Sequence, residues 1–405
     1  MSFATLALIC LVALVGPLFA VPRHGGLPVV IGELLVGLVL GQTGLQALDA
    51  TNETFSFMAQ IGFALVMFIA GTNVPLRNPA MRAGLRWGVA RALLAGALAV
   101  PVGLGLAALF GTGHGALYAV LLASSSAGLV MPALADVQIA GRHGVEMLVQ
   151  LAVADAACII LLPLAMQPAK VGHAAFGATV VLAGAGLCYL ALSRAGRSGR
   201  QRRLHKVSEQ HQFAAELRIT LVLLFGLAAV AVYLQVTIML AGFALGVAVS
   251  AVGEPRRVAH QLFALSEGFF APLFFVWLGA SLDLRQLATN PQSLLLGLAL
   301  GVGAVAVHAA PILTRQPWPI ALVTAAQLGV PIGAVTLGKA LDVFQPGEAT
   351  ALLIGALVTI GVVAMAAGGV RRVLAAEVGA SLPDGSPPRR AGAEGAAASG
   401  RSDPS

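Results

Sequence analysis

The sequence predicts an all-α membrane protein of about thirteen transmembrane helices, arranged as two inverted repeats with two broken helices that cross. Three observations predict this class: the composition, the placement of basic residues between apolar segments, and paired glycine and proline interruptions. Hydrophobic residues make up 58% of the 405 residues and charged residues only 10%, with a mean hydropathy of +0.90. A soluble domain averages about 25% charged residues. The composition therefore excludes an ordinary soluble domain, and we expect the lipid bilayer to surround the protein.

The apolar segments are long enough to cross a bilayer, because about 20 helical residues span its hydrocarbon layer. The first segment lacks the basic start and the small-residue cleavage site of a signal peptide, so we interpret it as a helix. The predicted spans are 3–21, 27–45, 57–76, 86–110, 115–136, 145–166, 171–193, 216–234, 237–252, 262–282, 293–314, 318–340 and 347–370.

The basic residues fix the expected orientation. With a cytoplasmic C-terminus, thirteen spans place the N-terminus outside. Of the 24 Lys and Arg residues, only Lys170, Arg285 and Lys339 then lie on or near the outer side. This asymmetry follows the positive-inside rule. It predicts a multi-pass protein of the cell membrane, typically a bacterial inner membrane, and it explains the net charge of +7 without a nucleic-acid partner.

Two stretches lie outside the spans. Residues 194–212 form a basic cytoplasmic linker between the halves, and residues 375–405 have the Gly, Ala, Ser, Pro and Arg composition of a disordered tail. Residues 1–374 are expected to form one transmembrane domain. The chain has no G-x-x-x-x-G-K-[ST] phosphate loop, so we predict neither ATP-driven transport nor an enzyme. The cysteines lie unpaired inside apolar runs, which indicates no disulfide, resident metal or cofactor; they are Cys10, Cys158 and Cys188.

The two halves repeat with an offset of seven spans. Because this offset is odd, corresponding helices run in opposite directions, as in the inverted repeats common among secondary transporters. The fifth span carries SSSAGLVMP and the twelfth carries AAQLGVPIG, so we expect helix breaks at Gly128, Pro132, Gly329 and Pro331. Glycine and proline at mid-membrane free backbone groups that a cavity or a neighbour must satisfy. The alternative is a pair of kinks used only for packing.

The sixth span, VEMLVQLAVADAACIILLPLAM, carries one carboxylate, Asp155, near its middle. An acid at the centre of a membrane helix costs about 2.5–3.5 kcal/mol on the insertion scale, so such acids are usually functional. Burial disfavours the charged form. A carboxyl that cannot hold a proton and a cation together would exchange H⁺ for Na⁺ or K⁺. The alternative is a structural acid paired within the bundle.

Other polar residues of the spans are candidate partners for this acid. Hard cations prefer oxygen ligands, which Ser124, Ser125 and the freed carbonyls of the broken spans would supply. His308 is either a charge partner or a histidine hydrogen-bonded to a neighbour. Gln150 is interpreted as orienting its neighbours, and Glu33 as a structural acid or one lining the dimer domain.

Four segments, taken in their order and spacing, resemble the monovalent cation:proton antiporters, the sodium/hydrogen exchanger-like family that includes the Kef and Nap types. They are LPVVIGELLVGLVLGQTGL, FALVMFIAGTNVPL, AGFALGVAVS and FFAPLFFVWLGASLDL, and the likeness covers roughly residues 5–370. The resemblance implies a homodimer with a dimerisation domain and a mobile domain that moves like an elevator. It also implies that Asp155 stands at the family's ion-binding aspartate.

The sequence departs from the family pattern at four positions. Ala154 stands where many relatives carry Asp, Asn or Gln, and His308 stands where many carry a membrane-embedded lysine. Gln327 replaces an acidic motif of the twelfth span, and Asn73 stands where the third span often ends in a glutamate. These changes leave Asp155 as the only acid near the middle of its span and make Gln327 and Asn73 supporting candidates.

The predicted function is exchange of H⁺ for Na⁺ or K⁺ by elevator-type alternating access, with Asp155 binding the proton or the cation in turn. Two alternatives stay open: a secondary transporter of an organic solute on a similar fold, and a membrane sensor that has lost transport. An intramembrane protease would need a second intramembrane Asp, or His308 beside the serines 124–126, and nothing else in the sequence indicates it.

Overall fold

The structure, a computed structural model, describes residues 2–16, 29–72, 74, 81–134, 139, 141–197, 215–253, 256–282, 284–285 and 290–381. Regular secondary structure in these residues is helical throughout, as predicted, and each predicted span has a helical counterpart. The helices are α1 (Phe3–Ala13), α3 (Val29–Leu40), α4 (Glu53–Thr72), α5 (Met81–Phe110), α6 (Gly115–Ala123), α7 (Ala127–Ala133), α8 (Gly141–Met166), η1 (Pro168–Lys170), α9 (Val171–Arg197), α11 (Ala215–Tyr233), α12 (Ile238–Val252), α13 (Arg256–Leu265), η2 (Ser266–Phe270), α14 (Ala271–Ala280), α16 (Pro291–Ala309), η3 (Ala310–Thr314), α17 (Trp318–Val323), α18 (Gly329–Leu341) and α19 (Glu348–Ser381).

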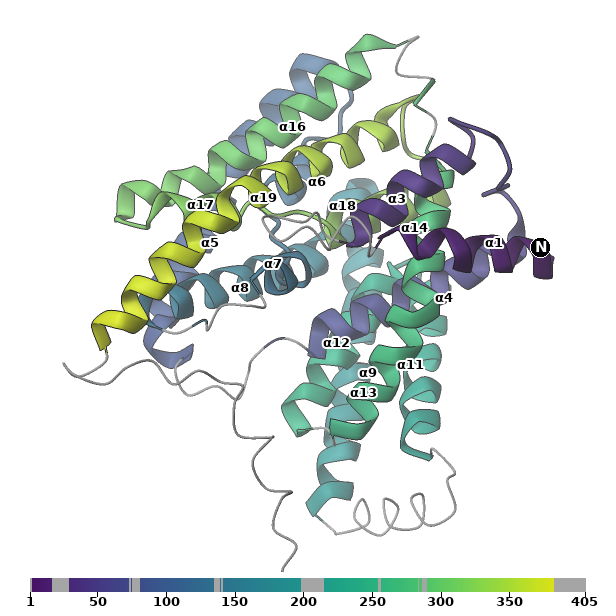
Figure 1. The fold of residues 1–405 in the computed structure, drawn as a ribbon, viewed down its shortest axis with the longest axis horizontal. Helices are drawn as coiled ribbons and strands as arrows, with labels where there is room; N and C mark the ends of the chain where they lie inside the picture. The colour runs from purple at the N-terminus through teal and green to yellow at the C-terminus, as the bar shows by residue number, and fades with distance from the viewer. Residues whose placement is uncertain are drawn as a thin grey trace, which may run out of the picture.

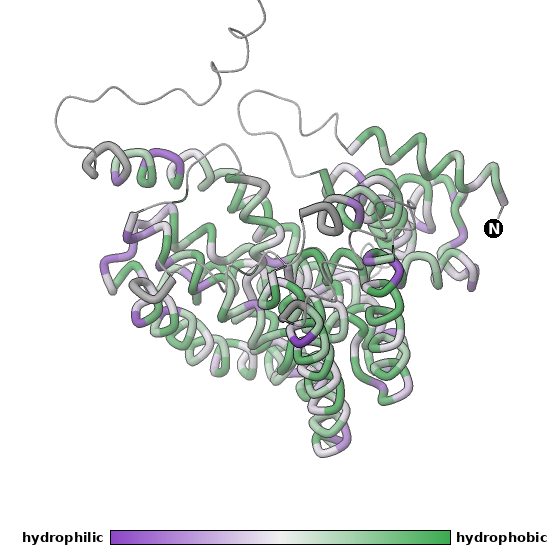
Figure 2. The backbone as a smooth tube through the Cα atoms, turned by 90° about the horizontal axis from the view of Figure 1, so that it is seen from below, coloured by the Kyte–Doolittle hydropathy of each residue, from purple (hydrophilic) through white to green (hydrophobic). Residues whose placement is uncertain are grey.

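Within the described ranges, eight helical segments are long and apolar enough to cross a membrane, and shorter apolar helices accompany them. Figure 2 shows hydrophobic residues along most of the helices, with hydrophilic residues mainly near their ends. A bilayer requires this pattern, because a helix satisfies its own backbone and needs only apolar side chains toward lipid.

The helices pack as two groups (Figure 1). The scaffold group contains α1, α3, α4, α9, α11, α12, α13 and α14, and its main contacts join α4 to α12 and α3 to α14. The broken-helix group contains α5, α6, α7, α8, α16, α17, α18 and α19, and its main contacts join α5 to α6 and α8, and α16 to α19. We call the boundary between the groups the seam.

The fifth and twelfth spans are both interrupted, but earlier than predicted. The first break separates α6 from α7 at residues 124–126, and the second separates α17 from α18 at residues 324–328. Gly128 and Pro132 fall within the bounds of α7, and Gly329 and Pro331 begin α18. Proline is tolerated in the first turn of a helix, where its missing N–H has no partner to lose. Pro331 therefore starts a half-helix and does not make the break.

The predicted start of the tail at residue 375 was also too early. Helix α19 continues to Ser381. The segment RRVLAAEVGA at residues 371–380 is rich in good helix formers, which outweigh its single glycine. Residues 382–405 lie outside the described part of the chain, as do residues 198–214 of the linker region.

Candidate ion-binding site

Each break begins with a hydroxyl side chain that satisfies a freed carbonyl. Ser124 Oγ donates to the carbonyl of Leu121 over 2.7 Å, and Thr324 Oγ1 donates to the carbonyl of Ala321 over 2.7 Å. Both bonds reach back three residues and both hydroxyls are fully buried. Ser and Thr close the ends of helices in this way because their side chains compete with the backbone ladder. The two repeats thus end their first half-helices by the same device.

The two breaks are joined directly by side chains. Ser125 Oγ donates to the carbonyl of Thr324 over 2.6 Å. The side-chain amide of Gln327, in the second break, donates to the carbonyl of Leu121 at the end of α6. The breaks therefore meet inside the broken-helix group.

Asp155 lies on α8 beside the first break. Its side chain is buried, with 6% of the residue exposed, and its carboxyl interacts with the backbone N–H of Ala127, the first residue of α7. The N-terminus of a helix carries partial positive charge, which favours a carboxylate there. In the described part of the chain no Lys, Arg or His forms an ion pair with Asp155. Among the described residues, the Asp155 carboxyl therefore interacts with a backbone N–H and not with a basic side chain.

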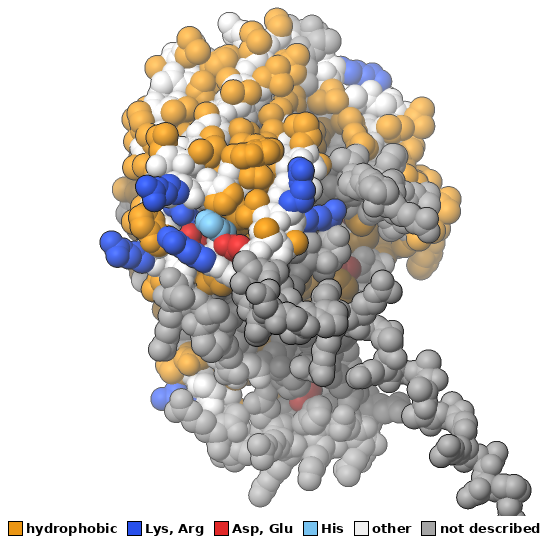
Figure 3. Space-filling view, turned by 60° about the vertical axis from the view of Figure 1, so that its left-hand side comes forward, with side chains coloured by type: hydrophobic (Ala, Val, Ile, Leu, Met, Phe, Trp, Pro, Cys, Tyr) orange, Lys and Arg blue, Asp and Glu red, His pale blue; other side chains and the backbone are white. Residues whose placement is uncertain are grey.

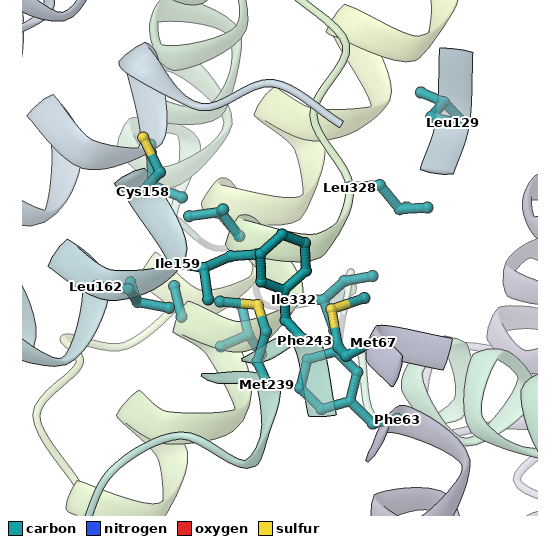
Figure 4. Close-up of a cluster of buried hydrophobic side chains, with 14 of the residues drawn as sticks. Phe63, Met67, Leu129, Cys158, Ile159, Leu162, Met239, Phe243, Leu328 and Ile332 are labelled. Carbon is teal, nitrogen blue, oxygen red and sulfur yellow. The ribbon is translucent and has the colours of Figure 1, made fainter. Parts of the chain in front are cut away.

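Asp155 faces the seam. Cys158 and Ile159 follow it by three and four residues and so share its face of α8. Figure 4 shows these two side chains among buried apolar residues from both groups. The scaffold group contributes Phe63 and Met67 of α4 and Met239 and Phe243 of α12, and Ile332 of α18 lies with them.

The other polar candidates form a hydrogen-bond network at the second break. Gln150 Nε2 donates to Thr324 Oγ1 over 3.2 Å, and Gln150 Oε1 accepts from Gln316 Nε2 over 2.9 Å. Gln316 is 2% exposed and its Oε1 has no hydrogen-bond partner among the described residues. Gln150 therefore contacts the second break, and the orienting role expected from the sequence stays a prediction.

His308 lies in this same network. Its Nδ1 is 3.0 Å from the carbonyl of Ala304, and its Nε2 is 3.3 Å from Ser125 Oγ. The structure therefore brings together Ser124, Ser125, Gln150, Gln327 and His308. Among the described residues Asp155 forms no hydrogen bond or ion pair with any of these side chains.

Two further candidates lie elsewhere. Glu33 lies on α3 in the scaffold group and is buried, with 4% of the residue exposed. A negative charge on Glu33 would be repelled by one on Glu267. Asn73 lies outside the described residues.

Sequence reasoning missed Thr324, Gln316 and the N–H of Ala127. Thr324 offered a signal, because it is a polar residue just ahead of the glycine and proline pattern of its span. Ala127 offered none, since its contribution is a backbone group that any residue would supply.

A buried ion pair at one end of α8 was also missed. Arg91 Nη1 of α5 lies 2.6 Å from Glu146 Oε2, and both side chains are 2% exposed. Arg142 pairs with Glu146 over 2.8 Å, and His143 pairs with Glu377 of α19. Figure 3 shows Lys and Arg side chains gathered with acids and a histidine at the edge of a largely hydrophobic face. These pairs hold the polar end of α8, since buried charges are normally paired.

The overall fold matches solved structures. The sodium proton antiporter MjNhaP1 from Methanocaldococcus jannaschii, solved at pH 8, superposes with a TM-score of 0.64 and 16% identity. The match covers 93% of this chain and 99% of that one. At this identity the likeness establishes the fold alone.

Relatives are also found by sequence. The chain is 23% identical over 380 residues to the putative Na⁺/H⁺ antiporter YjbQ of Bacillus subtilis, covering 88% of this chain and 61% of that protein. It is 27% identical over 336 residues to the Na⁺/H⁺ antiporter NhaS5 of Synechocystis, covering 79% of this chain and 46% of that protein. The Na⁺/H⁺-K⁺ antiporter GerN of Bacillus cereus is 25% identical over 262 residues, which are 64% of this chain and 66% of GerN. The chain thus spans only about half to three-fifths of the first two relatives.

The family comparison decides the assignment. Residues 10–378 match the description "Sodium/hydrogen exchanger, transmembrane", which covers nearly the whole described chain. The fold, the two interrupted helices and the relatives agree with this match. This multi-pass membrane protein is therefore a transporter homologue and not an enzyme, and it belongs to the sodium/hydrogen exchanger family.

Proposed function

We propose that this protein exchanges H⁺ for Na⁺ or K⁺ across the membrane, with Asp155 binding the proton or the cation in turn. The carrying observation is the position of Asp155: a buried carboxyl at a helix break, facing the seam, with no ion-pair partner among the described residues. A structural acid at that depth would be expected to have a basic partner. The printed names of the relatives, Na⁺/H⁺ and Na⁺/H⁺-K⁺ antiporters, support the same ion class.

The chemistry requires only competition at one carboxyl. A protonated carboxyl cannot bind a metal cation, and a carboxylate with Na⁺ or K⁺ beside it has little affinity for a proton. Oxygen ligands suit these cations. The freed carbonyls near Asp155, with the Ser124 and Ser125 hydroxyls, are the proposed further ligands. Both hydroxyls donate their hydrogens to carbonyls, which leaves their oxygen lone pairs available to a cation.

Alternating access is proposed to occur by sliding of the broken-helix group along the scaffold group. Near the middle the seam is apolar, with two methionines, Met67 and Met239, among its side chains (Figure 4). Apolar contacts have no directional bonds to break, and methionine adapts its shape easily. A cavity of about 460 Å³ lies at one end of the seam between Gln60, Thr237 and Lys339. An apolar cavity of about 590 Å³ lies between α8, α9 and α12, lined in part by Ala156 and Phe243.

The assembly and orientation belong to the same proposal. Residues 1–374 act as one transport domain, a homodimer forms through the scaffold group, and the C-terminus is cytoplasmic in a cell membrane of the bacterial inner-membrane type. The basic residues between the predicted spans support the orientation.

The test is Asp155→Asn, measured as cation-dependent proton flux in inverted membrane vesicles with Na⁺ and K⁺ added in turn. Asparagine keeps the shape but cannot carry a proton, so we expect flux to fall below detection. The amount of inserted protein should be unchanged, because removing a buried charge eases insertion.

Glu33→Gln is the matched control, since it removes an equally buried acid from the scaffold group. It should keep the exchange activity. Flux that survives in Asp155→Asn, under a gradient that drives the parent protein, would mean that another group is the carrier.

A further inference from the structure

The cavity of about 460 Å³ at one end of the seam is built by both groups of helices. Its lining includes residues of α4, α12 and α14 from the scaffold group and of α18 from the broken-helix group. None of the lining residues is a proposed ligand of the transported cation. The cavity is therefore a second candidate binding site, distinct from the one at Asp155.

The described lining of this cavity carries one positive charge and no negative charge. Lys339, near the end of α18, is exposed and therefore charged at neutral pH, and it forms no ion pair among the described residues. Its Nζ donates to the carbonyl and the hydroxyl of Ser281, over 3.2 and 3.3 Å. An ammonium group has three hydrogens, so one remains for another acceptor. The acids Glu53 and Asp342, at the ends of α4 and α18, do not line the cavity.

The N-terminus of α12 adds to the positive potential. Thr237, the N-cap, and Ile238, the first residue of the helix, both line the cavity, and a helix N-terminus carries partial positive charge. Thr237 Oγ1 accepts from the N–H of Met239 over 3.2 Å, which leaves its own hydrogen for another acceptor. Ser56 and Gln60 of α4 also line the cavity, and their side chains form no hydrogen bond among the described residues. Several donors thus lie around this cavity without an acceptor.

Most of the remaining lining is apolar. Phe63, which Figure 4 shows among buried apolar side chains, stacks on Phe274 with ring centroids 4.8 Å apart. Trp277 Nε1 donates to the carbonyl of Ala50 over 3.0 Å, so the indole offers the cavity only its ring surface. Ligand pockets of about 300–1,000 Å³ usually combine such apolar walls with a few polar groups.

We propose that this cavity binds a small organic anion, made of an apolar or aromatic body that carries one carboxylate or sulfonate group. The anionic group lies between Lys339 and the N-terminus of α12, and the body lies against Phe63 and Trp277. A cation finds no acidic ligand among the lining residues, and an uncharged solute leaves the charge of Lys339 uncompensated.

A bound anion contacts both groups of helices at once. A ligand shifts an equilibrium towards the state that it binds better. Sliding of α18 along α4 and α12 would separate the residues that hold the anion, so an occupied cavity keeps the two groups in this arrangement and slows exchange. This consequence rests on the proposed function, whereas binding of the anion does not.

The first experiment is calorimetric titration of the purified full chain in detergent, at fixed ionic strength, with benzenesulfonate as the probe. Benzenesulfonamide has nearly the same shape without the charge and is the comparison ligand. We expect saturable binding of benzenesulfonate, about tenfold tighter than that of benzenesulfonamide, because a hydrogen bond to a charged group contributes about that much. Equal affinities, or no saturable binding of benzenesulfonate, would overturn the proposal.

Variants then assign the binding to this cavity. Lys339→Met should weaken benzenesulfonate binding about tenfold and leave benzenesulfonamide unaffected, whereas Lys339→Arg, which keeps the charge, should retain most of the affinity. Gln60→Leu removes one neutral donor and should have a smaller effect in the same direction, which gives a test independent of the lysine. Lys170→Met, which removes an exposed lysine from η1, is the matched control and should bind as wild type. Wild-type affinity in Lys339→Met would place the anion elsewhere and overturn the proposal.

Transport separates this inference from the proposed function. Benzenesulfonate is the anion of a strong acid, so it does not carry protons across the membrane. Added outside right-side-out vesicles, where the predicted topology places the cavity, it should halve the cation-dependent proton flux at the concentration that half-fills the site in calorimetry. Lys339→Met should be insensitive to that concentration. An unchanged wild-type rate would overturn the link between the cavity and sliding.

Asp155→Asn distinguishes the two failures. It should lose the flux and bind benzenesulfonate with wild-type affinity. If the wild-type protein exchanges no cation, the proposed function fails, and calorimetry still decides whether the cavity binds an anion.

Discussion

The scaffold group and the broken-helix group are held together by different contacts. In the scaffold group, glycines let two pairs of helices approach until backbone meets backbone. A Cβ placed on Gly37 of α3 would lie 2.2 Å from the carbonyl oxygen of Val276 in α14, and one on Gly246 of α12 would lie 2.1 Å from that of Phe68 in α4. Gly41 and Gly242 repeat these contacts one turn away. Such spacing of small residues is a common way for membrane helices to associate.

These two pairs correspond to each other in the repeats. Helices α3 and α4 are the second and third spans, and α12 and α14 are the ninth and tenth, so an offset of seven exchanges one pair for the other. In the broken-helix group the two repeats meet where the two interrupted spans cross. This crossing is held by hydroxyl and amide side chains such as Ser125, Gln150 and Gln327. Here too the two repeats use the same device.

The difference separates rigidity from adaptability. Backbones in van der Waals contact have one close-packed arrangement, because a shift of part of an ångström produces a clash. Hydroxyl and amide groups can exchange one partner for another at small net cost, since a typical hydrogen bond contributes only about 1 kcal/mol. The scaffold group is therefore suited to stay fixed while the broken-helix group changes.

The largest expected effect comes from filling a glycine contact. Gly246→Val should leave little folded protein, because the new side chain meets the Phe68 backbone and overpacking costs about 3 kcal/mol or more. The measurement is the yield of monodisperse protein from membranes and its thermal unfolding. Gly226→Val on α11 is the control, since a Cβ there meets nothing within 4 Å. An equal loss of folded protein in both variants would show that replacing any helical glycine destabilises the protein, whether or not the glycine is in a close helix contact.

A smaller but clear effect is expected at the buried ion pair of the broken-helix group. Arg91→Met should lower the free energy of unfolding by about 3 kcal/mol, because Glu146 keeps only the exposed Arg142 as a partner. Unfolding in detergent by denaturant measures this. Adding Glu146→Gln to Arg91→Met should recover most of the loss. A double variant as unstable as the single one would show that the arginine acts by packing and not by charge.

The smallest effect on stability is expected at a polar contact across the seam. Lys339 Nζ of α18 donates to the carbonyl and hydroxyl of Ser281, at the end of α14, over 3.2 and 3.3 Å. Lys339→Met should change the free energy of unfolding by less than about 1 kcal/mol, because this contact is solvent-exposed. Exchange should become a few times faster, since sliding would no longer break this contact.

Initial rates of proton flux at saturating cation measure the effect of Lys339→Met. Lys170→Met, which removes an exposed lysine from η1, is the control and should leave the rate unchanged. A stability loss at Lys339 without a change of rate would place the contact outside the moving boundary.

Several features were accessible from the sequence because they depend on local composition. The helical nature of the spans was predicted correctly, since twenty apolar residues in a row have few alternatives to a membrane helix. Asp155 stood out because an acid is conspicuous in such a run. The breaks were located only to within a few residues, because glycine and proline mark the neighbourhood. The exact residue at which each helix ends is decided by the hydroxyls of Ser124 and Thr324, which bond the carbonyls three residues earlier.

By itself the sequence determined that this chain is an all-helical membrane protein with two interrupted spans and one acid near the middle of its sixth span. Periodicity, apolar length and charge placement act within a segment, so they can be read without knowing its neighbours. Only the tertiary structure decided that Asp155 faces the Ala127 N–H while His308 contacts Ser125. Those partners come from segments more than a hundred residues apart or from a backbone group that no side chain announces. Which of them meet depends on how the two groups of helices pack.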